Sequence, residues 1–208
     1  MKIHKLVFIS ALVTLALVYG GMAQANTATG NLWHVPEATS QNAIPANVPA
    51  APADVTFDVF SPFNFSGSGV TVGTWLGSSG AFNIVENTAG TLASLMDNGV
   101  VGTLLNFTGF VSVTNGQQFT VTHDDGLTLI IGGLDLGFSP LPTAPITSLA
   151  TYNGPTGNFP FQLVYAECCG GPAVLQVDLP FQSVPEPATG LFLVTGILGL
   201  LGYGWRKR

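Results

Sequence analysis

Apolar residues are distributed along this chain in two different ways. At each end they form a long run without charge, over residues 6–18 and again over residues 188–205. Between these runs they occur in short stretches, often alternating with polar residues and separated by glycine, proline or asparagine. A period of two is typical of β-strands that bury one face. The pattern therefore predicts two terminal segments outside the fold and one β-rich body between them.

The N-terminal run has the order of a secretory signal peptide. Lys2 and Lys5 precede the apolar residues 6–18, and a small-x-small sequence ending at Ala25 follows them. A positively charged start, a short apolar centre and a small-residue cleavage site are the marks of a secretory signal. We predict a signal peptide over residues 1–25, cleaved after Ala25, and therefore an exported protein.

The C-terminal run predicts a transmembrane helix over residues 188–205. Its length corresponds to roughly 27 Å at about 1.5 Å per residue, close to the roughly 30 Å hydrocarbon core of a bilayer. Three cations, Arg206, Lys207 and Arg208, follow at once. Such stop-transfer cations favour the cytoplasmic side, so the body is expected on the opposite side of the membrane.

The body, residues 26–182, has the pattern of a single all-β domain, and its length suits one core. Stretches rich in β-branched and aromatic residues predict strands separated by turns. The predicted strands are residues 55–60, 69–76, 105–113, 118–122, 127–131, 159–165 and 174–179. Residues 134–158 contain four prolines and predict a long loop. Several short strands at this spacing predict a β-sandwich.

Turn residues predict how these strands connect. The Asn-Gly pair at positions 115–116 is a strong hairpin sequence, so strands 105–113 and 118–122 are expected to pair. Strands 159–165 and 174–179 are expected to form a second hairpin.

Charge is divided unevenly between the body and the two ends. All five lysines and arginines lie in the terminal segments, whereas the body carries ten of the eleven acidic residues. A body without a permanent cation has nothing to neutralise phosphates, so nucleic acid is not expected as a partner. The carboxylates also lack lysine or arginine partners within the body. Solvent, backbone N–H groups or a divalent cation are left to stabilise them.

The body shows no constellation typical of an enzyme. It holds two histidines, His34 and His123, and neither a Gly-x-Ser-x-Gly sequence nor a zinc-spaced histidine pair. Asp124 and Asp125 are neighbours on one turn, whereas glycoside hydrolysis needs two carboxyl groups on either side of the scissile bond. We therefore expect no enzymatic activity.

Cys168 and Cys169 are adjacent and are the only cysteines. In an oxidising compartment cysteines tend to pair, and we favour a vicinal disulfide, which would make a rigid hinge in a loop. Two free thiols or links to another chain are the alternatives. A metal-binding pair is less well supported, because no further cysteine or histidine lies nearby.

The C-terminal segment resembles a known sorting signal. Val184, Pro185, Glu186 and Pro187 precede the predicted membrane helix, and the cationic cluster ends the sequence. A Pro-Glu-Pro triplet, a short span and terminal cations, in this order, resemble the PEP-CTERM sorting tail of Gram-negative bacteria. The resemblance implies that residues 183–208 are recognised by exosortase, a membrane enzyme that processes such tails. It implies a protein anchored in the membrane before processing and then found at the cell surface or outside the cell. A plain C-terminal membrane anchor is the alternative.

The body resembles the PA14 family, most firmly over residues 105–179. The resemblance lies in an Asp-Asp-Gly turn at positions 124–126 before an aliphatic strand, and in a late apolar strand that carries Tyr165 and Glu167. It implies a PA14-like β-sandwich with jelly-roll-like connections.

In lectin-like PA14 members the consecutive aspartates bind calcium, and the metal holds sugar hydroxyls. Carried over, Asp124 and Asp125 are the candidate ligands of a calcium cofactor, which takes six to eight oxygen ligands. Those lectins also use an asparagine from a later loop, which residues 167–172 lack, and Glu167 is the candidate replacement. The alternative is a structural turn whose carboxylates accept backbone N–H groups.

Two classes of function follow. The first is a secreted, surface-sorted binding module without enzymatic activity that contacts extracellular polysaccharide or matrix. Trp33, Trp75 and Tyr152 are candidates for stacking on sugar rings, although a place in the core or at its rim is favoured for each of them. The second is a structural or adhesive matrix protein with no small-molecule ligand.

Overall fold

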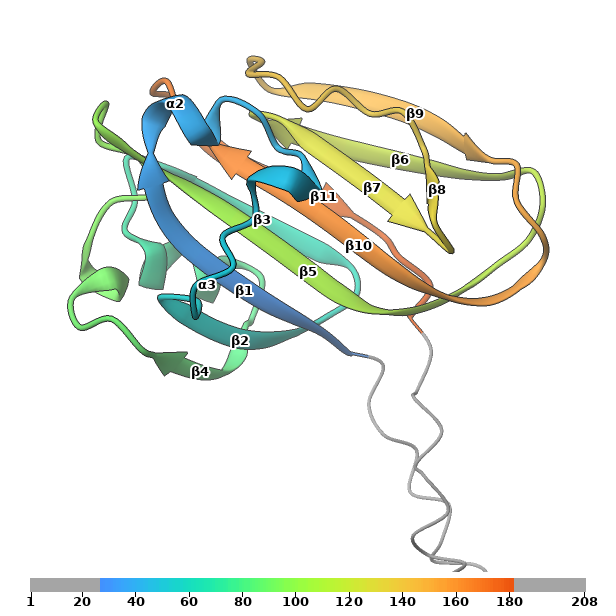
Figure 1. Cartoon of the computed structure of the whole chain (residues 1–208), viewed down its shortest axis with the longest axis horizontal. Coiled ribbons are helices and arrows are strands. Elements are labelled where there is room, and N and C mark those ends of the chain that lie inside the picture. The colour runs from blue at the N-terminus through green and yellow to red at the C-terminus, as the bar shows by residue number, and fades with distance from the viewer. Residues whose placement is uncertain (1–26, 182–208) are drawn as a thin grey trace, which may run out of the picture. The chain divides into compact units, whose positions relative to one another are not determined.

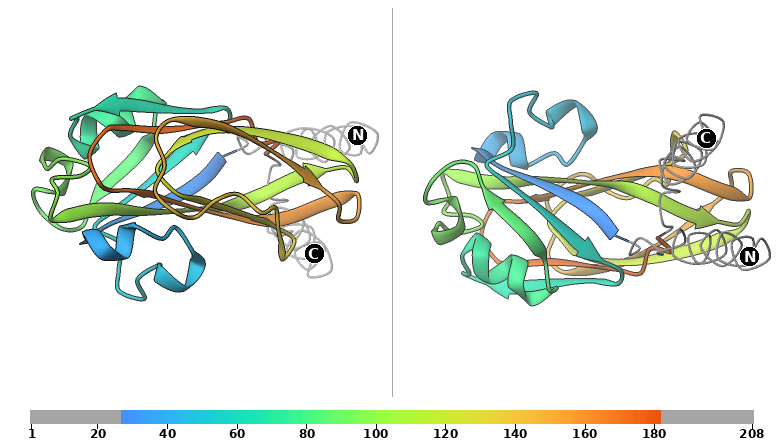
Figure 2. Two further views of the ribbon diagram at one scale, coloured as in Figure 1. Left: turned by 90° about the horizontal axis from the view of Figure 1, so that it is seen from above. Right: turned by 90° about the horizontal axis from the view of Figure 1, so that it is seen from below.

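The computed structural model describes residues 27–181. The predicted signal peptide (residues 1–25) and the tail (residues 183–208) with its helix (residues 188–205) lie outside these residues. Among the described residues, no helix is long and apolar enough to cross a membrane. The prediction of an all-β body is confirmed, because two sheets form two facing layers with short helices at their margins (Figures 1 and 2).

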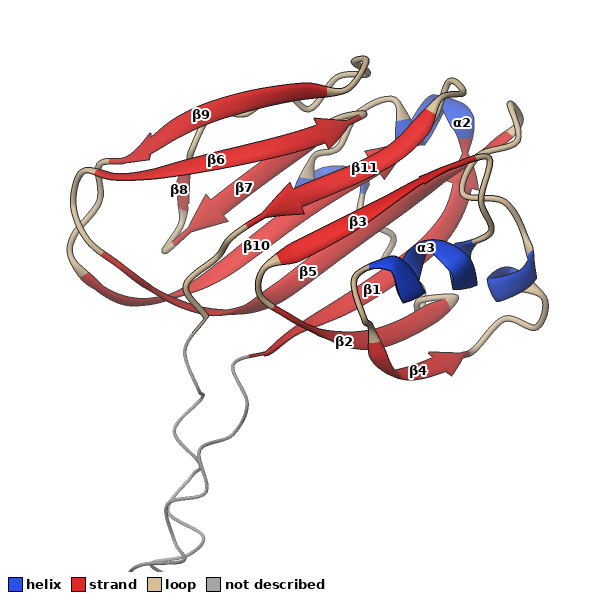
Figure 3. Ribbon diagram, turned by 180° about the vertical axis from the view of Figure 1, so that it is seen from behind, coloured by secondary structure: helices blue, strands red, loops and turns tan. Residues whose placement is uncertain are grey.

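The larger sheet has seven strands and the smaller one has four, and the strand pairs are antiparallel. The order in the larger sheet is β4 (Phe82–Glu86), β2 (Val55–Phe60), β1 (Thr27–Pro36), β5 (Val101–Val113), β10 (Gly157–Glu167), β7 (Leu127–Ile131) and β8 (Leu134–Asp135). The order in the smaller sheet is β3 (Phe63–Ser68), β11 (Pro172–Val177), β6 (Gln117–Asp124) and β9 (Ile146–Tyr152). Figure 3 shows the smaller sheet in front of the larger one.

Aromatic side chains fill the space between the sheets. The ring of Phe107 on β5 lies 4.8 Å from that of Phe63 on β3 and 5.7 Å from that of Phe57 on β2, between centroids. The neighbouring strand β1 makes room for this cluster at Gly30. A Cβ atom there would lie 2.2 Å from Cζ of Phe57, so the phenyl ring occupies the space of a side chain.

One predicted strand is a helix. Residues 69–76 were expected to be extended, but α3 spans Val72–Ser78. The Thr71 side chain accepts a hydrogen bond from the Thr74 N–H and caps the helix, as threonine commonly does at this position. Val72, Trp75 and Leu76 then fall on one face and are buried. Apolar residues at i, i+3 and i+4 are the pattern of a helix, and this short instance of it was mistaken for a strand.

Both predicted hairpins are wrong in their pairing, although their strands are present. The Asn-Gly turn at positions 115–116 leads from β5 in the larger sheet to β6 in the smaller one. The loop after β10 likewise carries the chain across to β11, which pairs with β3 and β6. The turn residues mark where the chain reverses, whereas the choice of sheet depends on which layer each apolar face covers.

The region predicted as a long loop, residues 134–158, contains two strands. β8 forms a short hairpin with β7 after the glycine turn, and β9 pairs with β6 at the edge of the smaller sheet. Most side chains of β9 are partly or fully exposed, including Ile146 and Leu149. An edge strand with little buried surface lacks the apolar alternation by which strands are recognised.

Three other helical turns lie at the margins of the sandwich. α2 (Glu37–Ser40) follows β1 directly, and η1 (Pro45–Asn47) lies in the proline-rich segment between α2 and β2. η2 (Thr91–Ala93) lies between β4 and β5.

The ends of the described chain and the loop after β10 lie at opposite ends of β5. Near the start of β5, Thr103 pairs with Glu167, the last residue of β10. Near its end, Val111 forms a bridge with Phe181, and β1 begins beside the same part of β5. The strand between Thr103 and Val111 corresponds to about 26 Å at roughly 3.3 Å per residue. The length of the sandwich therefore separates the two regions (Figure 1).

We expect Trp75→Ala to lower the free energy of unfolding by about 3–5 kcal/mol, the usual loss for a buried tryptophan. Trp75 stacks on Phe65, with centroids 4.2 Å apart, and its indole N–H donates to Ala173 O at 3.1 Å, so it joins α3 to β11. Urea unfolding measures the loss. Trp75→Phe should lose less, and Val100→Ala, at a side chain 74% exposed, about 0.5 kcal/mol or less. Equal losses at positions 75 and 100 would contradict the packing described.

Candidate functional site

Three segments meet where β6 ends. The Asp-Asp-Gly turn at positions 124–126 leads from β6 to β7, residues 139–145 cross beside it, and residues 168–171 join β10 to β11. Gly126 is required at this crossing, because a Cβ atom there would lie 2.0 Å from Pro140 O. The turn is therefore packed against backbone and is not a free surface loop.

Asp125 links the two neighbouring segments through its carboxylate. Oδ1 accepts a hydrogen bond from the Thr143 N–H at 3.1 Å, and Oδ2 accepts one from the Cys168 N–H at 2.7 Å. Burial raises the pKa of Asp125, whereas these two N–H donors oppose the rise. This arrangement has the features of the structural turn that the sequence left as an alternative.

The side chain of Asp124 has different contacts from that of Asp125. It is 4% exposed, and no backbone N–H, amide or hydroxyl donor within residues 27–181 reaches its carboxylate, which is hydrogen-bonded instead to the carboxyl group of Asp125. Burial, followed by the nearby charge of Asp125 and a hydrogen bond to that residue, raises the pKa of Asp124 to about 6. Its carbonyl oxygen accepts a hydrogen bond from the Tyr165 hydroxyl. The backbone of Asp124 is thus held in place while its carboxylate keeps its ligand capacity.

The His123 side chain contacts the Asp-Asp-Gly turn. Its ring is fully buried, with Nδ1 2.5 Å from Asp125 O and Nε2 3.4 Å from Ser148 Oγ on β9. In the tautomer with a proton on Nδ1, the ring donates to the Asp125 carbonyl. His123 lies next to the end of β6 and contacts both the turn and the edge strand β9.

Glu167, Tyr165 and Asp97 extend the acidic cluster. The Glu167 side chain is 2% exposed, and Oε2 accepts a hydrogen bond from the Tyr165 hydroxyl at 2.9 Å. Burial, followed by the charges of Asp125, Asp124 and Asp97, raises the pKa of Glu167 to about 9 despite that hydrogen bond. The sequence named Glu167 as a candidate calcium ligand, but Asp97 was missed because its contact, with the Gly170 N–H at 3.0 Å, joins residues 73 positions apart.

Cys168 and Cys169 form a disulfide in the structure. Cys168 is buried and Cys169 is exposed, so the pair lies at the surface of the loop after β10. Their sulfur atoms and one Asp125 oxygen lie within 4.8 Å of one another. Bonded sulfurs provide no thiolate, which is the form that binds metals, so this group is not a metal site in the disulfide state.

A hollow of about 380 Å³ opens at the turn. We call it the aspartate hollow, and it is lined by Asp124, Asp125, residues 142–145 and residues 169–172. The donor chemistry of its walls fits a calcium ion. Asp124 offers carboxylate oxygens that no N–H or hydroxyl group of residues 27–181 contacts, and each Asp125 oxygen accepts one N–H and keeps a second lone pair. Oxygen ligands of this kind are those that calcium prefers.

The candidate stacking aromatics are not available to a ligand. Trp33 is 8% exposed and donates its indole N–H to Ala51 O, Trp75 lies in the core, and Tyr152 is 1% exposed. The alternative of stacking on a sugar ring is therefore excluded for these three residues in this structure. The other alternative, a role in the core or at its rim, agrees with their burial.

The raised carboxyl pKa values predict that the body becomes less stable as pH rises. Between the ordinary value of 4.5 and about 9, Glu167 holds more protons in the folded than in the unfolded state. Glu167 then contributes a slope of up to about −1.4 kcal/mol per pH unit to the free energy of unfolding. Without divalent cations, thermal unfolding should occur at lower temperature at pH 8 than at pH 5. Glu167→Gln should flatten this dependence, whereas Asp135→Asn, at an exposed aspartate, should keep it. An unchanged slope in Glu167→Gln would contradict the assignment.

Comparisons with known proteins address both the tail and the body. Residues 183–208 match the model of the PEP-CTERM protein-sorting motif. The PA14 sugar-binding domain from an RTX adhesin is similar with a TM-score of 0.53 and 20% identity, covering 78% of this chain and 93% of that chain. The PA14 domain of the antifreeze protein MpAFP is similar with a TM-score of 0.50 and 19% identity, covering 74% of this chain and 81% of that chain. No curated protein matches the chain.

At this level of identity, the likeness to solved structures concerns the fold alone. The motif itself implies export, membrane-anchored sorting and processing by exosortase. The chain thus carries a PEP-CTERM sorting motif, and its body has a fold similar to that of PA14 domains.

Proposed function

We propose that the protein is a secreted, surface-sorted binding module without enzymatic activity. Its body contacts extracellular polysaccharide or matrix through the aspartate hollow, with a calcium ion held by Asp124 and Asp125. The observation that carries the proposal is the state of Asp124. A nearly buried carboxylate that no N–H or hydroxyl group of residues 27–181 contacts faces an open hollow, in a body whose sequence contains no lysine or arginine.

Two comparisons support the proposal. The adhesin domain of similar fold is described as sugar-binding. The sorting motif is consistent with a place of action at the cell surface or outside the cell, where polysaccharide is available. Neither comparison names a ligand of this chain.

The residues around the hollow have separate tasks in this proposal. Asp125 holds the two neighbouring segments through the Thr143 and Cys168 N–H groups, and Tyr165 holds the backbone of Asp124. Asp124 keeps its oxygens for a ligand. A calcium ion, when bound, would supply open coordination positions for two neighbouring sugar hydroxyls. Pro142 and Pro145 stiffen one wall of the hollow, because proline restricts the backbone.

A structural or adhesive matrix protein without a small-molecule ligand is the second candidate. The edge strand β9 supports it. This strand carries no charged residue, and Ile146 and Leu149 are 47% and 60% exposed. Exposed apolar edges without charge are the kind that pair with another chain. Assembly that depends on protein concentration, without glycan binding, would favour this candidate.

We expect the body, residues 26–182, to bind neutral glycans on an array in the presence of calcium and to lose this binding in chelator. Asp124→Asn should weaken the binding by about tenfold or more, because it removes a charged ligand of a divalent cation. The double variant Asp124→Asn, Asp125→Asn should abolish it. The matched control is Asp135→Asn with Asp178→Asn, which removes the same charge at two exposed positions outside the hollow.

Thermal unfolding of each variant separates loss of binding from loss of fold. Asp124→Asn should remain folded, because no N–H or hydroxyl donor of the described body depends on its carboxylate. Binding that survives both chelator and the double variant would contradict a calcium site at this turn. A folded body that binds no glycan in either condition would contradict the binding module and favour the matrix protein.

A further inference from the structure

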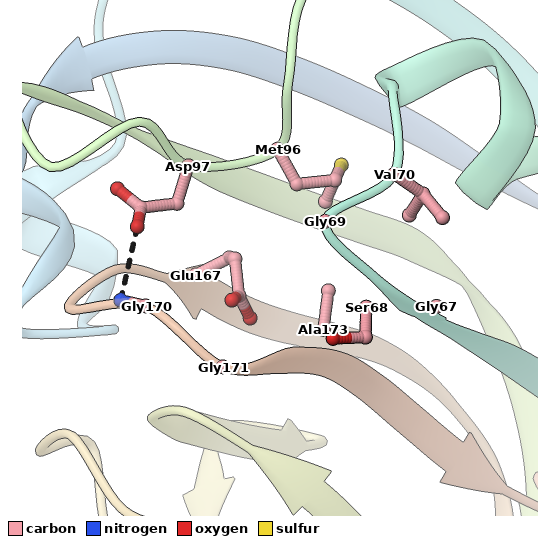
Figure 4. Close-up of a pocket in the computed structure, with 10 residues that line it drawn as sticks. All are labelled: Gly67, Ser68, Gly69, Val70, Met96, Asp97, Glu167, Gly170, Gly171 and Ala173. Atoms are coloured by element: carbon pink, nitrogen blue, oxygen red, sulfur yellow. Dashed lines mark hydrogen bonds between the residues drawn. The ribbon is translucent and has the colours of Figure 1, made fainter.

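A second hollow lies on the other side of the loop after β10. It has a volume of about 250 Å³, and three segments line it: the end of β3 with residues 69–70, Met96 and Asp97 before β5, and Glu167 with Gly170, Gly171 and Ala173 (Figure 4). We call it the glutamate hollow. In Figure 4 the Glu167 carboxyl group lies among these segments, below Asp97 and Met96. Of the site residues predicted within residues 27–181, Glu167 alone lines it.

One oxygen of Glu167 is left without a partner. Oε2 is engaged with the Tyr165 hydroxyl, and no hydrogen bond to Oε1 is present within residues 27–181. In that range, the only fully enclosed side-chain atom without a partner is Asn42 Oδ1. Oε1 of Glu167 therefore reaches the surface of the hollow, although the residue as a whole is 2% exposed.

The hydrogen bonds around Tyr165 show which oxygen of Glu167 is left for a ligand. The phenol hydroxyl contacts Asp124 O and Glu167 Oε2, so both of these oxygens are engaged within the protein. Oε1 keeps its lone pairs and can accept a hydrogen bond from a ligand hydroxyl. The raised pKa of Glu167, about 9, agrees with a ligand that carries no charge.

The walls suit a neutral ligand better than a cation. Asp97, the other carboxylate, accepts hydrogen bonds from the Gly99 N–H and the Gly170 N–H at 3.0 Å each. Among the described residues, the one close group of three metal-ligating side chain types is Asp125 with the two bonded cysteines, and Glu167 is not part of it. Calcium needs six to eight oxygens, whereas a ligand hydroxyl needs one acceptor. Val70, Met96 and Ala173 add an apolar wall of the kind that the carbon face of a sugar ring can contact.

The two hollows share a wall without side chains. Gly170 and Gly171 line both of them. A Cβ atom at Gly170 would meet nothing within 4 Å and would project into open space, and one at Gly171 would lie 3.6 Å from Asp124 Oδ2. Both glycines have positive φ angles, 76° and 125°, which other residues rarely adopt. The low ridge between the hollows is therefore a property of these two positions.

We propose that the glutamate hollow is a second subsite for a neutral, hydroxyl-bearing sugar unit, so that the protein binds oligosaccharide chains and not single sugars. One unit lies in the aspartate hollow, and the next crosses the Gly170–Gly171 ridge and donates a hydroxyl hydrogen bond to Glu167 Oε1. This inference rests on the proposed function and names its ligand class.

The test is a glycan array graded by length. It carries mono-, di-, tri- and tetrasaccharides of glucose, mannose, galactose and N-acetylglucosamine, and it is probed with residues 26–182 in calcium. These residues form one compact unit with the whole described core. The wild type should bind the disaccharide of its preferred sugar about tenfold more tightly than the monosaccharide, the gain expected from one further set of contacts.

Three variants test the second subsite directly. Glu167→Met removes the acceptor at similar size, and Ser68→Tyr fills the hollow from an exposed position that lines it. Both should reduce the ratio of disaccharide to monosaccharide affinity to about one, because only the first subsite remains. Glu167→Gln should keep the ratio, since its amide reproduces both the acceptor and the donor of the neutral acid. Ser66→Tyr, at an exposed serine outside the hollow, is the control.

Each outcome has one meaning. A wild-type ratio of one, with monosaccharide binding that needs Asp124, overturns the second subsite and leaves the proposed function in place. A ratio that Glu167→Gln abolishes overturns the neutral-acceptor role and indicates a cation at Glu167. No binding to any member of the array, by protein with a cooperative thermal transition, overturns both the subsite and the proposed function.

Discussion

A buried carboxyl group needs a cation, a hydrogen-bond donor or a proton, and this body contains no lysine or arginine to supply the first. The buried carboxyl groups of this body are stabilised in different ways. Asp125 receives two backbone N–H groups, and Glu167 holds a proton and shares a hydrogen bond with Tyr165. Of these three, Asp124 has no N–H or hydroxyl donor among the described residues and shares a hydrogen bond with Asp125 only. The buried acidic group with the weakest compensation thus lines the aspartate hollow.

The same interactions decide the shape of the loops. Asp125 ties residues 139–145 and the loop after β10 to one turn, and Asp97 ties that loop to the segment before β5 through the Gly170 N–H. Segments far apart in sequence therefore meet around four carboxyl groups. Repulsion among the charged members of this group opposes the contacts that hold the loops. A ligand that neutralises charge there would therefore stabilise the loops as well as bind to them.

The extent to which the sequence predicted this structure differs from element to element. Strands with clear alternation, such as β2, and the Asp-Asp-Gly turn were found, because their signals are local. α3 was missed, since its short apolar face around Trp75 has too few residues to establish a period. The pairing of strands was wrong because a turn of two residues says nothing about which of two sheets the chain enters. Asp97 lay beyond sequence reasoning, because its role depends on a contact with Gly170 that the whole fold creates.

The two ends of the described chain lie together. Phe181, where the described chain finishes, bridges β5 at Val111, and β1 begins beside the same part of β5. Glu167 pairs with β5 at Thr103, toward the other end of that strand. The sandwich therefore has a base, where the described chain begins and finishes, and a tip formed by the acidic loops. The points at which the chain continues lie a whole strand length away from both hollows.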